Sequence, residues 1–310
     1  MGENLGLVQF PHPGPEHKPE RGSDVMGWHR RDGPHCRKFL KSLGRWRDAT
    51  GQEQSGELTF WGEWEPQSRI IHRWPNAAKG APRFLHEPFW CVPADDRWLH
   101  NTDPFVFGGC FLYSNCRQSH YETLRELAPG SVILFGSPLG GSFVLDTVFV
   151  VASGVGYSWA KWAGISDVDD PFRRIVLDPL FTSQEDRSRK FRLYRGATPE
   201  VPWTGMFSFV PCRPASGDTA RFARPVIQLP GLVTPNLARR AKFTPLNVGA
   251  LERAWRSVVE QVHAQGLFLG YGMPVPREEP DWERGRSQAS PGPEGGEPPE
   301  GCSPRKLRGC

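Results

Sequence analysis

Two glutamates, Glu63 and Glu65, lie two residues apart in the segment Gly-Glu-Trp-Glu-Pro. Residues two apart on a β-strand point to the same face, so this spacing places both carboxylates side by side. Neighbouring carboxylates can hold different pKa values or share a divalent metal ion, and both arrangements serve hydrolysis. The alternative is an exposed polar face on an edge strand that ends at Pro66. The pair is a candidate catalytic site, and Asp103, in an Asn-Thr-Asp-Pro turn, is a third candidate.

The amino-terminal segment is dense in side chains that bind metal ions: His12, Glu16, His17, His29, His35 and Cys36. Zinc and related ions accept such ligands. Their spacing matches no standard metal motif and the region is rich in proline, so we favour a solvated or docking segment. If a metal does bind, His12 and His17 are expected to join Glu63 and Glu65 around it. The sequence assigns no cofactor.

Tryptophan is frequent in this chain, with 12 residues. Trp159 and Trp162 flank Lys161, an arrangement in which two indoles stack on bases while the lysine meets a phosphate. Buried tryptophans are the more common case, so a role in the core is the alternative for each ring. We predict Trp159, Trp162 and Lys161 as binding residues.

Basic residues are clustered near the amino terminus, although the overall formal charge of +4 does not require a polyanionic partner. Arg30 and Arg31 are the candidate phosphate contacts. Residues 35–47 follow, with apolar side chains at near-helical spacing among lysines and arginines. This pattern predicts a short basic amphipathic helix.

The expected architecture is α+β with a β-rich centre and a few short helices. The 34 glycines and 31 prolines disfavour a helical bundle and favour short elements joined by turns. Runs rich in β-branched and aromatic residues predict strands at 58–65, 104–113, 131–135, 142–152, 206–210 and 225–229. Apolar spacing predicts helices at 119–127 and, most clearly, at 251–262.

Composition divides the chain into three parts. Residues 1–55 form a basic, Pro- and His-rich segment with the short helix, residues 56–276 a globular domain, and residues 277–310 a disordered tail. The seven cysteines form no Cys-x-x-Cys pair, and the chain shows neither a secretory signal nor a membrane-spanning run. These features predict a cytoplasmic protein with reduced thiols and no membrane association.

Residues 113–151 have a recognisable order of features. A turn containing Cys116-Arg117-Gln118 leads to a helix ending in Leu-Arg-Glu-Leu, a Pro-Gly-Ser turn and the strand Val-Ile-Leu-Phe-Gly-Ser, followed by a Gly-Gly loop and a long strand. This order resembles the small β-barrels of the PUA-like superfamily, most of all its EVE and ASCH branches. Such barrels hold a nucleic-acid base, often a modified one, in a cleft.

Carried over by position, Arg117 and Gln118 match the polar residues before the family's helix, and Ser137 matches the end of its central strand. The chain departs from the pattern by a Gly-Ser turn in place of Gly-Asp and by a long leader with motifs of its own. The Trp- and Gly-rich chain is also similar in style to nucleotide-modification-associated domains of bacteria and phages.

Asp146 interrupts an apolar strand and faces either solvent or the cleft, since a carboxylate inside such a strand needs a partner. The first functional expectation is recognition of a nucleic acid or nucleotide, including one with a modified base, within a nucleic-acid modification or defence system. Its residues are Trp159, Trp162, Ser137 and Asp146 in the cleft, with Lys161, Arg117, Gln118, Arg30 and Arg31 at phosphates or base edges.

The second expectation is a metal-dependent hydrolase or base-modifying enzyme that acts on nucleic acid or nucleotides through Glu63, Glu65 and Asp103. The motifs of P-loop, zincin, α/β-hydrolase and Rossmann enzymes are absent from the sequence, which disfavours those classes. A structural interaction protein is a third possibility, suggested by the Pro-rich ends.

Overall fold

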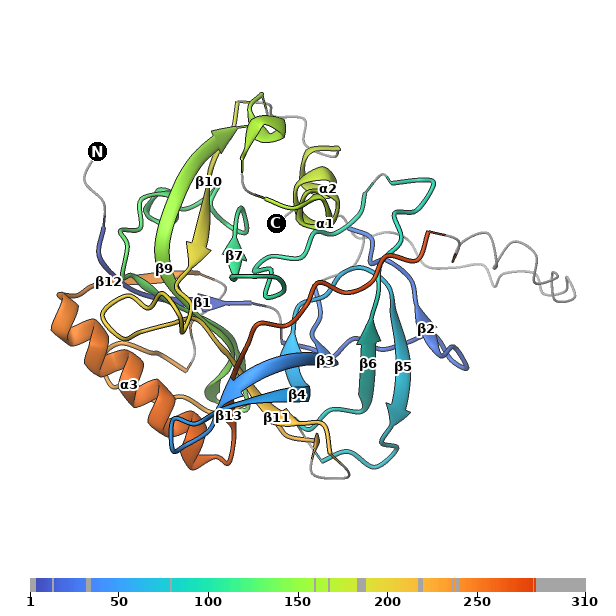
Figure 1. The fold of residues 1–310 in the computed structure, drawn as a ribbon, viewed down its shortest axis with the longest axis horizontal. Helices are drawn as coiled ribbons and strands as arrows, with labels where there is room; N and C mark the ends of the chain where they lie inside the picture. The colour runs from blue at the N-terminus through green and yellow to red at the C-terminus, as the bar shows by residue number, and fades with distance from the viewer. Residues whose placement is uncertain are drawn as a thin grey trace, which may run out of the picture.

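The structure is a computed structural model, shown in Figure 1. It describes residues 4–12, 14–31, 35–78, 80–96, 98–158, 160–166, 168–182, 188–216, 220–235, 237, 240–280 and 282. Two mixed β-sheets contain most of the regular secondary structure in this part of the chain.

The first sheet contains six strands within the described residues, and only the β1–β8 pair is parallel. Their order is β12 (Lys242–Pro245), β1 (Gly6–Pro11), β8 (Val132–Leu139), β9 (Ser142–Ser158), β10 (Lys190–Gly196) and β7 (Leu112–Tyr113). Gly140 and Gly141 form the β8–β9 turn with positive φ values of 60° and 81°. Two such residues suit the tight turn of a hairpin.

The second sheet contains seven of the described strands. Their order is β13 (Phe268–Tyr271), β11 (Val210–Pro214), β4 (Glu53–Gly62), β3 (Lys38–Arg47), β6 (Phe84–Pro88), β5 (Ser68–Arg73) and β2 (Val25–Met26). β13 also pairs with β3, and β3 and β6 are parallel.

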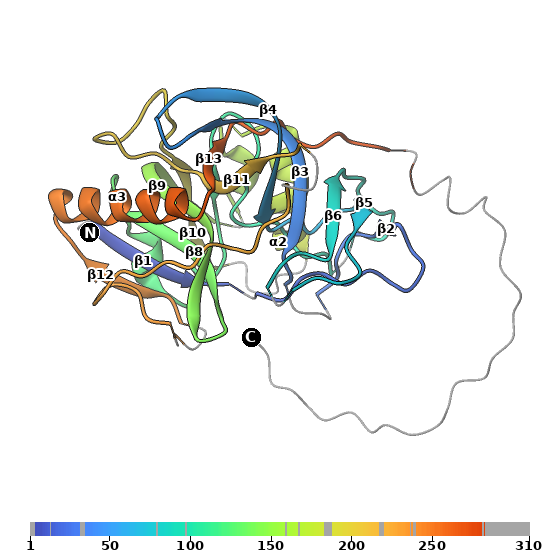
Figure 2. The ribbon, with the colours of Figure 1, turned by 90° about the horizontal axis from the view of Figure 1, so that it is seen from below.

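Helix α3 (Val248–Ala264) confirms the expected helix at 251–262. Leu251, Ala254, Val258 and Val262 form its buried stripe, and Asn247 caps its amino terminus by accepting a hydrogen bond from the Ala250 amide. Figures 1 and 2 place α3 at one end of the molecule and strands β2, β5 and β6 at the other. The remaining described helical pieces are short: α1 (Asp170–Phe172), α2 (Asp178–Thr182), a π-helical turn at Arg173–Leu177, and 3-10 turns at Glu122–Arg125 and Trp162–Gly164.

The expected basic helix at 35–47 is wrong, because most of this segment is strand β3. β3 pairs antiparallel with β4 over its whole length, from Lys38 opposite Gly62 to Arg47 opposite Glu53. Long-range pairing satisfies the backbone here and overrides the near-helical spacing of apolar residues. Since β1 and β3 belong to different sheets, the amino-terminal segment contributes strands to both.

Other expected elements are confirmed in part. β8 contains all but the first residue of the predicted strand at 131–135, β9 contains the one at 142–152, and β4 contains the start of the one at 58–65. The segment 104–113 is a strand only at Leu112–Tyr113, and the helix at 119–127 is reduced to a 3-10 turn. The segments 206–210 and 225–229 contain little strand beyond isolated bridges.

The β-rich fold is therefore confirmed, whereas a closed PUA-like barrel is not seen in the described residues. β8 and β9 pair as the resemblance expects, but they lie inside the first sheet, whose order runs from β12 to β7. No described helix is long and apolar enough to cross a membrane.

The first residues of the expected tail are held against the second sheet. The Trp90 amide donates to the Arg277 carbonyl and the Glu279 amide to the Trp90 carbonyl, while Glu279 pairs with Arg69. Trp282 packs edge-on against Phe89. Apart from Trp282, the tail beyond residue 280 lies outside the described residues.

Candidate metal centre

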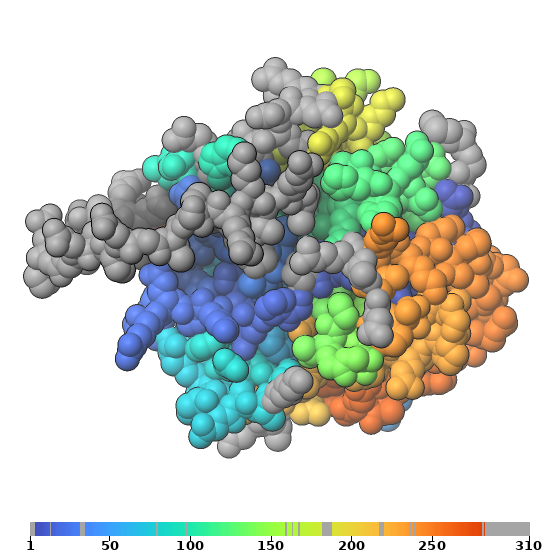
Figure 3. Space-filling view, turned by 180° about the vertical axis from the view of Figure 1, so that it is seen from behind, coloured from blue at the N-terminus to red at the C-terminus, as the bar shows by residue number. Residues whose placement is uncertain are grey.

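Side chains from both sheets meet in one buried polar cluster. His12 follows β1 of the first sheet, and Glu63 follows β4 of the second. His12 Nδ1 lies 3.2 Å from Glu63 Oε2, and both side chains are 2% exposed. The cluster therefore forms where the strand ends of the two sheets come together. Figure 3 shows that residues near the amino terminus, in blue, cover a broad part of the face seen from behind.

Glu65 is the centre of the cluster. Its Oε2 accepts a hydrogen bond from His29 Nδ1 at 2.8 Å, and its Oε1 accepts one from His35 Nδ1 at 2.8 Å. His35 Nδ1 is also 3.5 Å from Glu63 Oε1. The pair Glu63 and Glu65 thus lies together, as the spacing predicts, but beyond the end of β4 and buried, so the exposed edge-strand alternative is wrong.

Backbone hydrogen bonds fix the positions of these side chains. The His29 amide donates to the Glu65 carbonyl at 2.8 Å, and the Glu65 amide donates to Thr102 Oγ1 at 3.1 Å. The His17 amide donates to the Arg37 carbonyl at 2.9 Å. The histidines therefore come from irregular segments that are each tied to a neighbouring segment of the cluster.

Arg37 connects the cluster to the first sheet. Its guanidinium pairs with Glu63 at 2.8 Å and with Asp146 of β9 at 3.1 Å. Asp146 also pairs with Arg224 at 3.4 Å, and Arg224 donates a hydrogen bond to Ser137 Oγ at 3.0 Å. Asp146 and Ser137, which the sequence assigns to a base-binding cleft, are therefore both buried and both held by arginines.

Asp103 anchors the loop that carries Cys116. Its carboxylate accepts hydrogen bonds from the backbone amides of Ser114, Asn115 and Cys116 at 2.6–2.9 Å, and its own amide donates to Glu63 Oε1. Burial raises the pKa of Asp103 to about 7, whereas the hydrogen bonds from the three amides favour the ionised carboxylate and act to lower this pKa. The loop places Cys116 Sγ 3.1 Å from His12 Nε2.

Burial and local charge separate the pKa values of the two glutamates. Burial raises the pKa of Glu63, although Arg37 opposes this. Burial also disfavours ionisation of Glu65, but His35 and His29 hold its pKa well below the usual value. Burial lowers the pKa of His17 to about 3. Burial also acts to lower the pKa of His35, but the negative charges of Glu65 and Glu63 outweigh it and raise that pKa to about 9.

These side chains offer the right atoms for a divalent ion. Among the described residues, two groups have ligand atoms within 4.8 Å of one another: His17, His29 and Glu65, and His35, Glu63 and Glu65. Imidazole and carboxylate ligands suit zinc and related transition metals. Solvent reaches the cluster from the imidazole side, because the side chains of His35 and His29 are 28% and 16% exposed whereas Glu65 is fully buried.

A buried lysine beside the cluster makes stability depend on pH. Lys38 is fully buried and donates to the Pro66 carbonyl at 2.8 Å. Burial lowers its pKa from 10.5 to about 7, while Glu65 and Cys36 act in the opposite direction. Between these pH values the unfolded chain binds more protons than the folded one, so this contribution to stability increases with pH across that window.

We expect the difference in unfolding free energy between wild type and Lys38→Met, without metal, to increase by up to about 1.4 kcal/mol per pH unit from pH 7 upwards. Urea unfolding of both proteins at pH 7, 8 and 9 measures this difference, in which titrating groups that do not interact with Lys38 cancel. A difference that does not change with pH would mean that Lys38 is not held in this way.

Several of the predicted binding residues make contacts within the fold. Gln118 exchanges two hydrogen bonds with the backbone of Arg192, at 2.7 and 2.8 Å. Arg31 donates to two carbonyls, and Arg30 contacts both the carbonyl and the carboxylate of Asp95. Arg117 lies over the ring of Phe10 at 5.5 Å.

The tryptophan pair is only partly described. Trp162 stacks on Phe181 at 5.5 Å, and Lys161 beside it is exposed. Trp159 lies outside the described residues.

Sequence reasoning missed three members of the cluster. Arg37, Arg224 and Cys116 were given no role at this site, because nothing in their local sequence shows that they meet Glu63 or Asp146. The density of histidines before residue 36 is the one sequence signal for this cluster, although their irregular spacing favours a docking segment. The structure brings His12, His17, His29 and His35 to the two glutamates.

No protein-family model matches the chain, and no curated protein or solved structure is significantly similar to it.

Proposed function

We propose that the chain is a metal-dependent hydrolase that acts on nucleotides or nucleic acid, with a divalent ion held by His35, Glu63 and Glu65. The observation that carries the proposal is the convergence of His35 Nδ1 with Glu65 Oε1 at 2.8 Å and Glu63 Oε1 at 3.5 Å. These separations are close to those between ligands that share one ion at about 2.0–2.2 Å. An ion would take the place of the proton between His35 and Glu65.

The ligand number suits catalysis rather than a purely structural site. Catalytic zinc sites use three protein ligands and keep one position for water or substrate. Here the two carboxylates are buried, and the partly exposed His35 leaves the ion accessible from the solvent side. A Zn²⁺ ion bound here would lower the pKa of its water to about 7 and so would supply hydroxide at neutral pH. Asp103 holds Glu63 through its amide.

The substrate class is supported by the sequence resemblance rather than by contacts at the site. Residues 113–151 resemble barrels that hold nucleic-acid bases, and their Cys116 turn forms one wall of the cluster. Nucleotides and nucleic acids are therefore the substrates to test first.

Cys116 provides a second candidate chemistry, since His12 lies between its thiol and Glu63 as in a nucleophile–base–carboxylate triad. Two observations make it the weaker candidate. Burial raises the pKa of the Cys116 thiol well above its usual value, so a reactive thiolate is disfavoured. His12 Nδ1 also makes no hydrogen bond among the described residues, although Glu63 is close.

Base recognition by a cleft at Trp159, Trp162 and Lys161 stays a prediction. Its supporting observation is the exposed Lys161 beside Trp162. Ser137 and Asp146 are held by arginines, and we do not place them in such a cleft.

The test is metal binding and metal-dependent turnover. Protein stripped with a chelator is dialysed against Zn²⁺ or Mn²⁺, its ion content is measured, and hydrolysis of nucleotides, DNA and RNA is followed. We expect His35→Ala to weaken ion binding by more than about 100-fold, since even outer-shell partners of a metal contribute 10–100-fold.

The matched control is His72→Ala, because His72 is an exposed histidine of β5. It is expected to bind the ion and turn over substrate like wild type. A folded wild-type protein that binds neither ion contradicts the proposal. Turnover that survives chelation and disappears in Cys116→Ser supports the thiol chemistry instead.

A further inference from the structure

We propose that the site holds two divalent ions bridged by Glu65, the second lying between His17, His29 and the Oε2 atom of Glu65. This inference rests on the proposed function and deepens it, because a single ion on His35, Glu63 and Glu65 does not involve His17 or His29. It assigns a separate role to each oxygen of one buried carboxylate.

The two oxygens of Glu65 face different histidines. Oε1 is 2.8 Å from His35 Nδ1, and Oε2 is 2.8 Å from His29 Nδ1. The two groups of candidate ligands share Glu65 as their common residue. A carboxylate in this position can bind one ion through each oxygen, and bridged pairs of ions in hydrolases lie about 3.5–4 Å apart.

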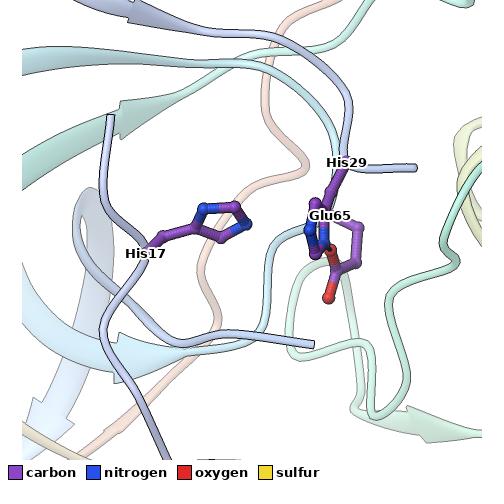
Figure 4. A group of neighbouring side chains, drawn as sticks. All are labelled: His17, His29 and Glu65. Carbon is purple, nitrogen blue, oxygen red and sulfur yellow. Dashed lines mark hydrogen bonds and ion pairs between the residues drawn. The ribbon is translucent and has the colours of Figure 1, made fainter. Parts of the chain in front are cut away.

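His17 is the residue that points to a ligand on the Oε2 side. Figure 4 shows its ring directed toward His29 and Glu65, and the centroids of the His17 and His29 rings are 4.5 Å apart. Its ligand atom lies within 4.8 Å of those of the other two residues, and its buried Nε2 has no hydrogen-bond partner among the described residues. A buried polar atom without a partner is costly, and a bound ion would satisfy it.

The backbone keeps this arrangement in place before any ion binds. The amide of His29 is bonded to the Glu65 carbonyl, and its carbonyl accepts from the His100 amide at 2.9 Å. The amide of His17 donates a hydrogen bond to the carbonyl of Arg37, and the side chain of Arg37 forms an ion pair with Glu63. The second group of ligands is therefore built on the segments that hold the first.

Two ions change the chemistry that the site can perform. Two divalent ions carry more positive charge than the carboxylates of Glu63 and Glu65 neutralise, so the centre favours hydroxide and an anionic substrate such as a phosphoester. In a two-ion site one ion stabilises the attacking oxygen and the other the leaving oxygen. In such a hydrolysis the water oxygen would bond to phosphorus, the bond from phosphorus to the leaving oxygen would break, and the leaving oxygen would gain the proton that the water loses.

The number of Mn²⁺ ions bound per chain, measured by equilibrium dialysis of chelator-stripped protein, tests the inference. We expect two ions per chain in wild type and in His72→Ala, and one in His17→Ala and in Glu63→Gln. Electron paramagnetic resonance gives an independent readout: two bridged Mn²⁺ ions couple, whereas the single ion in His17→Ala has the signal of isolated Mn²⁺.

The wild-type ion count, the count in His17→Ala and the spectroscopic coupling together separate the possible outcomes. One ion per chain, unchanged in His17→Ala, overturns the two-ion inference and leaves the proposed hydrolase intact. No bound ion in folded wild type overturns both. Two ions without spectroscopic coupling overturn the bridge by Glu65.

Discussion

Replacing Arg37 by methionine is expected to lower the free energy of unfolding by about 3–5 kcal/mol, because it removes one partner from a buried set of ion pairs. Arg37 is 1% exposed and is paired with Glu63 and Asp146, which are 2% and 3% exposed. The substitution leaves Glu63 without its guanidinium partner and Asp146 with Arg224 alone. Urea unfolding at neutral pH measures the change.

The matched control is Arg45→Met in strand β3. Arg45 is 41% exposed and pairs with Glu53 and Glu200 at the surface, where such pairs contribute about 0–1 kcal/mol. Combining Arg37→Met with Asp146→Asn is expected to cost less than the sum of the single changes, because the second removes a charge that the first leaves underpaired. Equal costs for Arg37→Met and Arg45→Met would show that the buried pairs do not stabilise the fold.

Replacing Glu65 by glutamine is expected to remove ion binding altogether and reduce metal-dependent turnover to background. Glu65 is fully buried and offers one oxygen to each proposed ion, so its loss affects both sites, whereas His17→Ala affects one. An amide is a neutral and weaker ligand than a carboxylate. Ion content and the increase in melting temperature on adding Zn²⁺ or Mn²⁺ are the measurements.

Glu57→Gln controls for the loss of a carboxylate near β4. Glu57 lies in β4, is 54% exposed and pairs with Lys41. This variant should keep the ion content and the thermal shift of wild type. Retention of the full ion content by Glu65→Gln would exclude Glu65 as a ligand and with it the bridge.

The strands and the long helix were predictable where a local pattern and the tertiary environment agree. The apolar stripe of α3 is buried as its spacing indicates, and the β8–β9 hairpin contains the Gly-Gly turn that its tight connection requires. The segment at 35–47 was not predictable, since its spacing suits a helix while its pairing with β4 makes it a strand.

The candidate site shows the same division. Sequence spacing alone brought Glu63 and Glu65 together, and composition singled out the histidines as metal ligands to consider. Irregular spacing carries no information about which loops approach one another, because such approaches are set by the packing of the two sheets. Asp146 illustrates this: the sequence requires that it have a partner, but only the fold identifies Arg37 and Arg224.

By itself, therefore, the sequence determined the β-rich composition, helix α3 and the close pair of carboxylates, because each depends on residues near one another in the chain. The tertiary structure decided that His17, His29 and His35 surround Glu65 and that Arg37 connects the sheets. These contacts join residues up to about a hundred positions apart in the chain. A buried charged group needs an oppositely charged or hydrogen-bonding partner, and only the packing of the fold decides which residue is close enough to be that partner.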